Sequence, residues 1–270
     1  MQTSDRTWVV TGAGSGIGRE LVLQLLDRGS RVAAVDLSAE TLQQTAQMVS
    51  QPERLSIHVV DITDQDAVAA LPEQVADAIG AVDGLINNAG IMQPFLPVND
   101  LPAATIAKVI DVNLMGTLAM TRAFLPGLLQ RPEAHLANVS SMGGFFPFPG
   151  QTVYGASKAA VKLLTEGLYA ELLDSNVGVS VIMPGGVDTN IAANSGVSDL
   201  AADDSSYPVT PADVAARIIL DGIERDRLHI YVGKDARIMN LAVRIAPRLT
   251  IRMVQRQMSK LIATQAADSS

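Results

Sequence analysis

The sequence has 270 residues, enough for one α/β domain with a large core, and its formal net charge of −8 argues against nucleic acid as a partner. It holds no cysteine, which excludes disulfides and cysteine-ligated zinc, and we predict no metal site. The N-terminus shows no targeting pattern and no apolar run approaches the roughly 20 residues that span a bilayer, so we expect a cytoplasmic protein.

The chain opens with a predicted strand over 7–11, a glycine-rich turn and a helix over 17–28. This order places a helix N-terminus against a pyrophosphate. The glycines stand as Gly12, Gly16 and Gly18, which is T-G-x-x-x-G-x-G rather than G-x-G-x-x-G. A plain turn needs one or two glycines, and more of them cost backbone entropy. The turn therefore predicts a dinucleotide site.

The next predicted strand, 31–36, ends at Asp36, 18 residues after Gly18. This is close to the distance of the carboxylate that binds the adenosine ribose hydroxyls. A carboxylate there repels a 2′-phosphate, and neither Leu37 nor Ser38 offers a positive charge. We predict NAD rather than NADP as the cofactor. The alternative is that Asp36 only caps the helix that begins near Ala39.

Strands and helices alternate along the rest of the chain without a break in composition. Such alternation predicts an α/β fold, a single Rossmann-like doubly wound parallel sheet of about seven strands with helices on both faces. Ligands bind beyond the carboxyl ends of strands in such a sheet, and Asp36, Asp61, Asn87, Ser141 and Pro184 lie at those ends. The further strands are expected at 55–60, 83–88, 134–139, 177–183 and 228–232, and the further helices at 39–50, 64–79, 102–130, 152–175 and 211–225.

Tyr154 and Lys158 stand one helical turn apart and so share one face of the predicted helix 152–175. A free phenol has a pKa near ~10, and a nearby ammonium lowers that pKa toward the operating range of a general acid or base. Ser141, thirteen residues before Tyr154, can hold a carbonyl oxygen beside the phenol; Ser140 is its rival. Tyr-x-x-x-Lys alone is common on surface helices, so the pair indicates a catalytic site only together with the surrounding motifs.

With these motifs in this order, the chain resembles the short-chain dehydrogenase/reductase family over about residues 7–233. The resemblance rests also on N-N-A-G at 87–90, Asn113 in D-V-N-L, and P-G-x-V-x-T at 184–189. It implies reversible hydride transfer between a nicotinamide and a carbonyl carbon, with Asn113, Ser141, Tyr154 and Lys158 as catalytic residues. The cofactor-binding residues predicted for NAD are Gly12, Ser15, Gly16, Ile17, Gly18, Asp36, Leu37, Asp61, Ile62, Asn88, Ala89, Gly90, Tyr154, Lys158, Pro184, Gly185, Val187 and Thr189.

The resemblance gives individual roles to several of these residues. It implies that Asp61 contacts the adenine, that Asn113 holds a water of a proton relay, and that Lys158 also binds the nicotinamide ribose. Two alternatives remain open from the residues themselves. Asn113 can instead mark a helix kink, and Asp61 can cap the helix after it, although Thr63 offers a second cap.

The substrate is predicted from apolar side chains near Ser141. Three of the five phenylalanines lie at 145, 146 and 148, with Phe95 and Met183 as plausible neighbours, and no lysine or arginine accompanies them. We expect an uncharged, fairly apolar ketone or secondary alcohol, such as a 3-oxoacyl or hydroxysteroid substrate, although the phenylalanines can equally be core. A non-catalytic NAD-binding sensor or scaffold is the alternative. The predicted substrate residues are Met92, Ser141, Gly143, Phe145, Phe148 and Tyr154.

Two segments depart from the regular plan of a catalytic domain over 1–233. Residues 188–210 hold four aspartates and no lysine or arginine, and are expected to form a lid over the substrate. The extension 234–270 carries a net charge of +6 up to residue 262, which leaves −14 for the rest. Its cations are Lys234, Arg237, Arg244, Arg248, Arg252, Arg256 and Lys260, interleaved with Ile238, Leu241, Ile245, Leu249, Met253 and Leu261.

This basic amphipathic tail fits an arm on an acidic neighbouring subunit, a peripheral helix on an anionic membrane, or a solvated helix. The family resemblance also implies a homodimer or homotetramer paired through helices 102–130 and 152–175. Leu163, Leu164, Leu168 and Leu172 recur at helical spacing in the second of these helices.

Overall fold

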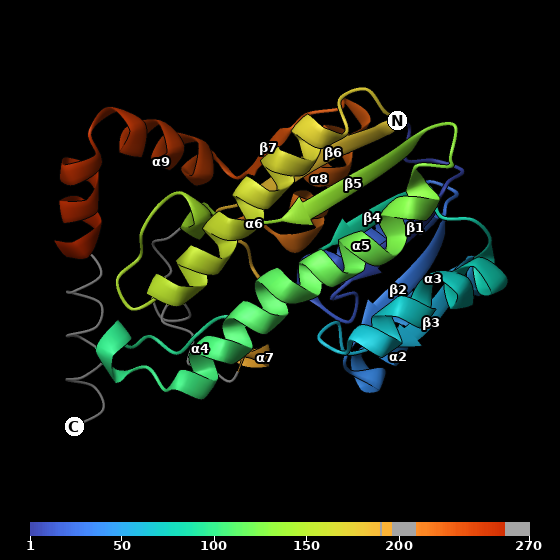
Figure 1. Cartoon of the computed structure of the whole chain (residues 1–270), viewed down its shortest axis with the longest axis horizontal. Coiled ribbons are helices and arrows are strands. Elements are labelled where there is room, and N and C mark those ends of the chain that lie inside the picture. Colours follow the sequence, from blue (N-terminus) through green and yellow to red (C-terminus); the bar gives the residue numbers. More distant parts are fainter. Residues whose placement is uncertain (190, 196–208, 257–270) are drawn as a thin grey trace.

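The computed structural model describes residues 1–189, 191–195 and 209–256. Its centre is one sheet of seven parallel strands in the order β3-β2-β1-β4-β5-β6-β7 (Figure 1). The predicted doubly wound fold is confirmed, and the predicted strand bounds agree to within one residue at each end. The strands are β1 Thr7–Thr11, β2 Arg31–Asp36, β3 Leu55–Val59, β4 Gly84–Asn87, β5 Ala134–Val139, β6 Val177–Pro184 and β7 His229–Val232.

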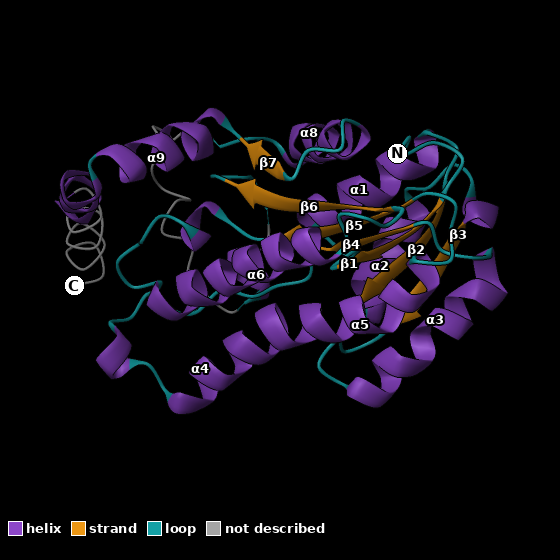
Figure 2. Cartoon of the chain, turned by 45° about the horizontal axis from the view of Figure 1, so that its top comes forward, coloured by secondary structure: helices purple, strands orange, loops and turns teal. Residues whose placement is uncertain are grey.

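Helices connect the strands and cover both faces of the sheet (Figure 2). They are α1 Gly16–Asp27, α2 Ala39–Gln47, α3 Gln65–Ile79, α4 Ala103–Ile110, α5 Thr117–Leu128, α6 Thr152–Glu171, α7 Ile191–Asn194, α8 Ala212–Glu224 and α9 Lys234–Ile245. Residues 247–256 form one more helix after Ala246, with Pro247 at its first position. Short 3-10 turns lie at η1 Pro52–Arg54, η2 Val98–Asp100 and η4 Met142–Gly144.

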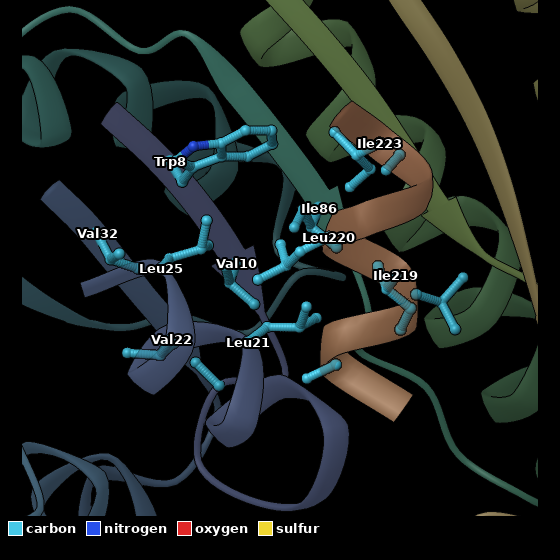
Figure 3. Close-up of a cluster of buried hydrophobic side chains, with 14 of the residues drawn as sticks. Trp8, Val10, Leu21, Val22, Leu25, Val32, Ile86, Ile219, Leu220 and Ile223 are labelled. Atoms are coloured by element: carbon cyan, nitrogen blue, oxygen red, sulfur yellow. The ribbon is translucent and has the colours of Figure 1, made fainter. Parts of the chain in front are cut away.

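Two apolar clusters hold these layers together because successive strand residues point to opposite faces. Trp8 and Val10 join the cluster beneath α1 and α8, which Figure 3 shows, while Val9 joins the cluster beneath α3, α5 and α6. Trp8 is fully buried. Burial of such a side chain contributes roughly 1.5–3 kcal/mol to folding. The clusters fix the sheet on which the site is built.

The predicted helix 102–130 is one long helix interrupted by a π-helical segment, η3 Asp111–Gly116. Within the described part of the chain, the helix 103–128 alone has the length and mean hydropathy of a membrane span, a test that core helices of soluble proteins also pass. Lys108, Asp111 and Arg122 interrupt it, so it holds no long apolar run. Met120, Phe124 and Leu128 pack this helix onto the sheet.

Candidate active site

The glycine-rich turn is folded as its sequence predicts. Gly12 and Gly16 have φ angles of +65° and +51°, which favour glycine. A Cβ on Gly18 would lie 1.9 Å from the carbonyl oxygen of Gly12, so only glycine fits at the first turn of α1. Thr189 packs against Gly16, because a Cβ there would lie 3.1 Å from the Cβ of Thr189. The structure thus brings the first and the last cofactor motifs together.

Asp36 lies at the carboxyl end of β2, beside this turn. Its two carboxylate oxygens accept hydrogen bonds from the amides of Gly14, at 2.9 Å, and Ser38, at 3.0 Å. The alternative that Asp36 caps α2 is wrong, since the Ser38 hydroxyl accepts the capping bond from the Thr41 amide. Leu37 follows with 68% of its side chain exposed. A carboxylate and an apolar side chain therefore border this end of the turn.

Arg19 is a neighbour of this corner that sequence reasoning missed. Its guanidinium donates to the Gly14 carbonyl, and its Nε donates to Thr45 Oγ1 at 3.1 Å. The signal was available, since Arg19 stands one residue after Gly18. These bonds tie the turn to α2.

Asp61 does not cap the helix that follows it, and neither does Thr63. Asp64 is the cap of α3, accepting from the amides of Asp66 and Ala67. Asp61 Oδ1 instead accepts from the amide and hydroxyl of Thr63, which holds this carboxylate at the end of β3. Ile62 is only 7% exposed, and its side chain packs against Gly116.

The segment 87–90 joins the central strands. The Asn87 amide donates to Asn138 Oδ1 at 2.9 Å, within the sheet, and to Thr121 Oγ1 at 3.1 Å. The Thr11 hydroxyl accepts from the amides of Asn88 and Ala89, both at 3.0 Å. These bonds lock the ends of β1, β4 and β5 beside the glycine-rich turn.

Ser141 and Tyr154 are linked by a side-chain hydrogen bond. Ser141 also accepts from the Gly143 amide at 3.0 Å, and so begins η4. Ser140 points elsewhere, because its hydroxyl donates to the Lys158 carbonyl at 2.7 Å and fastens α6 to the end of β5. The thirteen-residue offset thus selects the serine that lies beside the phenol.

Lys158 is 3% exposed, and its ammonium donates to the Val139 carbonyl at 3.0 Å. Asn113, in the π-helical segment, is fully buried and bonds to both backbone polar groups of Ile91 and to Ser157 Oγ. A Cβ on Gly90 would lie 3.0 Å from Lys158 Nζ and 3.1 Å from Asn113 Oδ1. Gly90 therefore lets the Lys158 and Asn113 side chains approach the backbone closely. π-Helical turns occur often at functional sites.

Burial controls the ionisation of the two central groups. Tyr154 is half-buried, and the loss of solvent around its hydroxyl raises the pKa of the phenol. The hydrogen bond with Ser141 lowers this pKa, but by less. Burial lowers the pKa of Lys158 from 10.5 to about 8. The expected lowering of the Tyr154 pKa is therefore wrong for this structure, because desolvation outweighs the favourable contact. The phenol is protonated at neutral pH.

Gln93 is a second residue that sequence reasoning missed. It is fully buried, and its side-chain oxygen accepts from the amides of Val153, at 2.8 Å, and Tyr154, at 2.9 Å. Its amide nitrogen donates to the Gly150 carbonyl at 2.8 Å. Gln93 thereby satisfies two backbone donors in the first turn of α6 and fixes the position of the Tyr154 backbone. No local pattern indicates a contact across 60 residues.

The loop after β6 completes this edge of the sheet. The Gly186 amide donates to Asp235 Oδ2 at 2.8 Å, and a Cβ on Gly185 would lie 2.1 Å from the same oxygen. Pro184 ends β6, and Val187 forms a parallel bridge with Thr210. The predicted lid, 188–210, falls largely on residues 190 and 196–208, outside the described part of the chain.

The apolar residues around Ser141 divide into partly exposed ones, which can border a substrate, and fully buried ones, which belong to the core. Gly143 packs on the Tyr154 ring, Phe145 lies edge-on to Tyr231 with centroids 6.1 Å apart, and the Met92 amide donates to Ser195 Oγ at 2.9 Å. Phe148 is partly exposed and contacts Phe146 edge-on. Phe146 and Met183 are 1% and 0% exposed, so these two are core rather than substrate neighbours. Tyr231 is a further aromatic residue that the sequence did not single out.

These residues fit a nicotinamide dinucleotide. Only glycine fits at Gly12 and Gly18 in the tight turn, and the Asp36 carboxylate lies beside that turn. At Gly90 a side chain would crowd Lys158 and Asn113. The same carboxyl edge carries Ser141, Tyr154 and Lys158. Among the described residues, no group of three or more histidine, cysteine or acidic side chains could hold a metal.

Comparison with known proteins agrees with this geometry. The family model described as short chain dehydrogenase matches residues 6–198. The chain is 31% identical over 263 residues to the putative oxidoreductase SadH of Mycobacterium tuberculosis, covering 93% of this chain and 95% of SadH. Two solved structures are similar over nearly their whole length.

The first is a short chain dehydrogenase/reductase from Burkholderia phymatum in complex with NAD, with a TM-score of 0.79 at 26% identity, covering 91% of this chain and 96% of that one. The second, from Burkholderia cenocepacia in complex with NADP, has a TM-score of 0.80 at 28% identity, covering 94% and 99%. The chain is thus an oxidoreductase that belongs to the short-chain dehydrogenase/reductase family, whose members bind a nicotinamide cofactor.

Proposed function

We propose that this chain reduces an uncharged, fairly apolar ketone, or oxidises the corresponding secondary alcohol, with NAD as its cofactor. The observation that carries the proposal is the protonated Tyr154 phenol bonded to Ser141, one turn before the buried Lys158. A sensor that only binds NAD has no need of this arrangement.

The bound nicotinamide supplies or accepts the hydride. Ser141 holds the substrate oxygen beside the phenol, and Tyr154 gives that oxygen its proton in the direction of reduction. The Lys158 ammonium stabilises the phenolate that remains. Lys158 and Asn113, whose side chains both border Gly90, are the residues through which the proton on Tyr154 is restored.

The preference for NAD follows from Asp36. Its carboxylate beside Gly14 accepts hydrogen bonds from ribose hydroxyls and repels a 2′-phosphate. Arg19 is held away from this carboxylate by its bonds to Gly14 and Thr45, and it forms no ion pair with Asp36. The neighbouring structures carry NAD in one case and NADP in the other, so the preference proposed here rests on Asp36 alone.

The proposed substrate lies against Phe145, Phe148 and Met92. The stretches 91–98 and 141–151 contain no lysine or arginine to bind a carboxylate or phosphate. An alicyclic ketone, a hydroxysteroid or a 3-oxoacyl chain has the apolar body that these side chains suit.

We also propose a cytoplasmic homodimer or homotetramer. Met115 and Leu163 are 46% and 70% exposed on the helices 103–128 and 152–171, and Leu173, just after the second helix, is 61% exposed. Leu168 and Leu172 instead pack in the core, so they face the sheet rather than a partner. An exposed apolar face of this kind is suited to a second subunit.

A panel of ketones assayed with NADH and with NADPH tests the function. Cyclohexanone, a 3-ketosteroid and a 3-oxoacyl thioester represent the proposed classes, and a 2-oxo acid serves as the charged control. We expect consumption of NADH with an uncharged ketone and none with the acid. Tight NADH binding without turnover of any ketone would favour the sensor instead.

A further inference from the structure

The two last helices of the described chain expose an unusual number of large apolar side chains. Ile238, Leu241 and Ile245 on α9 are 61%, 60% and 73% exposed. Leu249 and Met253 on the helix 247–256 are 71% and 50% exposed. We call these five side chains the tail row. Scattered exposed apolar residues need no explanation, whereas a contiguous set marks an interaction surface.

Cations accompany the tail row along both helices. Residues 234–256 carry six cations and one acid, all six cations are exposed, and none forms an ion pair within the part of the chain that the structure describes. The acid, Asp235, is turned inward onto the Gly186 amide. The cations are Lys234, Arg237, Arg244, Arg248, Arg252 and Arg256; Lys260 and Leu261 of the predicted tail lie outside the described residues.

Each helix divides into an attached side and an outward side. On α9, Ala236 is fully buried and Asn240 donates to the Tyr231 hydroxyl at 3.0 Å. On the helix 247–256, Thr250 and Val254, one turn apart, are each 5% exposed. At 100° per residue, Leu249, Met253 and Arg256 lie together on a different side. The outward surface is thus aliphatic and cationic.

The chemistry of this surface fits lipid better than a second copy of the chain. A twofold dimer that set tail against tail would oppose two sets of arginines, so docking on a second copy would need an acidic face opposite the tail. Five of the six cations are arginine, whose planar fork binds phosphate through two parallel hydrogen bonds. Helices with aliphatic side chains between basic ones lie at the headgroup boundary of anionic bilayers.

We propose that the tail row and its arginines bind the surface of an anionic phospholipid membrane. The aliphatic side chains enter the boundary of the acyl region, and the guanidinium groups bind headgroup phosphates.

The position of the tail gives this contact a consequence for the active site. Figure 1 places α9 and residues 247–256 at the end of the molecule toward which the strands β5 and β6 point. Tyr231, bonded to Asn240 of α9, contacts Phe145 of the proposed substrate wall. If the substrate is the apolar ketone of the proposed function, membrane binding brings the site close to the phase in which that ketone dissolves.

Vesicle co-sedimentation of the full chain tests the membrane contact without any assay of activity. Vesicles of phosphatidylcholine with phosphatidylglycerol should pellet the protein, vesicles of phosphatidylcholine alone should not, and added sodium chloride should release it. Arg248→Gln with Arg252→Gln should weaken partitioning about 30-fold, at about 1 kcal/mol for each charge. Leu241→Ser with Ile245→Ser should abolish pelleting as well.

Arg217→Gln with Arg225→Gln is the matched control, since both arginines are exposed and lie on or next to α8. It should leave pelleting unchanged, and the thermal midpoints of all variants should agree. Equal pelleting with neutral and anionic vesicles, or none with either, would overturn the proposal. So would a fall in particle mass by analytical ultracentrifugation in the arginine variant with vesicle binding unchanged, because that result assigns the tail to a neighbouring subunit.

Discussion

The start of α6 and the C-terminal tail differ in where their polar and apolar side chains point. Around Tyr154, polar groups are turned inward and bonded: Gln93 holds the first amides of α6, Ser140 holds the Lys158 carbonyl, and Ser141 holds the phenol. In the tail, Leu241, Ile245 and Leu249 are turned outward, and the arginines beside them form no ion pair among the described residues.

This difference separates chemistry from attachment. Catalysis needs a fixed geometry, which many buried hydrogen bonds provide, because leaving any of them unmade costs roughly 1–3 kcal/mol. Surface attachment needs accessible groups that find their partners only on contact. Changes at α6 should therefore affect turnover, whereas changes in the tail should affect where the protein resides.

The largest effect is expected from Lys158→Ala. Loss of the ammonium removes the stabilisation of the Tyr154 phenolate and a contact to the cofactor, so kcat/KM should fall by roughly 10³-fold. Lys162→Ala is the control, since Lys162 lies one turn further along α6 and pairs with Glu166 at 2.6 Å. Steady-state kinetics should be measured on both variants. Equal losses of kcat/KM would show that Lys158 has no special role in catalysis.

Asp36→Ala with Leu37→Arg should reverse the cofactor preference. The change removes hydrogen bonds to a charged acceptor and adds a cation for the 2′-phosphate, which should shift the ratio of kcat/KM between NADH and NADPH by about 10- to 100-fold. Glu40→Ala, an exposed carboxylate nearby on α2, should leave the ratio unchanged. A wild-type enzyme that prefers NADPH contradicts the role given to Asp36.

The pH dependence should report Lys158. Its pKa is lowered to about 8, so the required ammonium is present below that pH and lost above it. We expect kcat/KM of the wild type to fall about tenfold per unit well above pH 8 and the Lys158→Ala profile to lack this limb. For folding the sign is opposite: the unfolded chain binds the proton more tightly, so this group makes stability rise with pH between about 8 and 10.5.

A smaller effect is expected from Gln93→Leu. It removes the acceptor of the Val153 and Tyr154 amides and leaves them without that partner, which should lower kcat several-fold and destabilise the fold by about 1–3 kcal/mol. Gln93→Glu keeps the oxygen and should recover most of kcat. If both variants lose only stability, Gln93 supports the fold but does not position Tyr154.

The fold and the cofactor corner could be predicted because their signals are local. The seven strands, the turn at Gly12 to Gly18 and Asp36 depend on periodicity, on φ angles and on fixed spacing along the chain. The offset from Ser141 to Tyr154 also identified the serine that lies beside the phenol. These features are set within one supersecondary unit, so the sequence around them suffices.

What the sequence did not predict depends on distant neighbours. Gln93 acts across 60 residues, and Phe146 and Met183 are core because of the elements that happen to cover them. The N-cap of α3 is Asp64 rather than Asp61 or Thr63. The raised pKa of Tyr154 likewise results from burial by other segments, which no spacing along the chain reveals.

The most direct test of the account is Tyr154→Phe, which removes only the phenolic hydroxyl. NADH titration and single-turnover reduction of the best ketone should be measured on the same preparation as the wild type. We predict an unchanged dissociation constant for NADH and a rate lower by roughly 10²–10⁴-fold, the usual contribution of a general acid. A variant that retains a rate close to that of the wild type would contradict the assignment of Tyr154 as the proton donor.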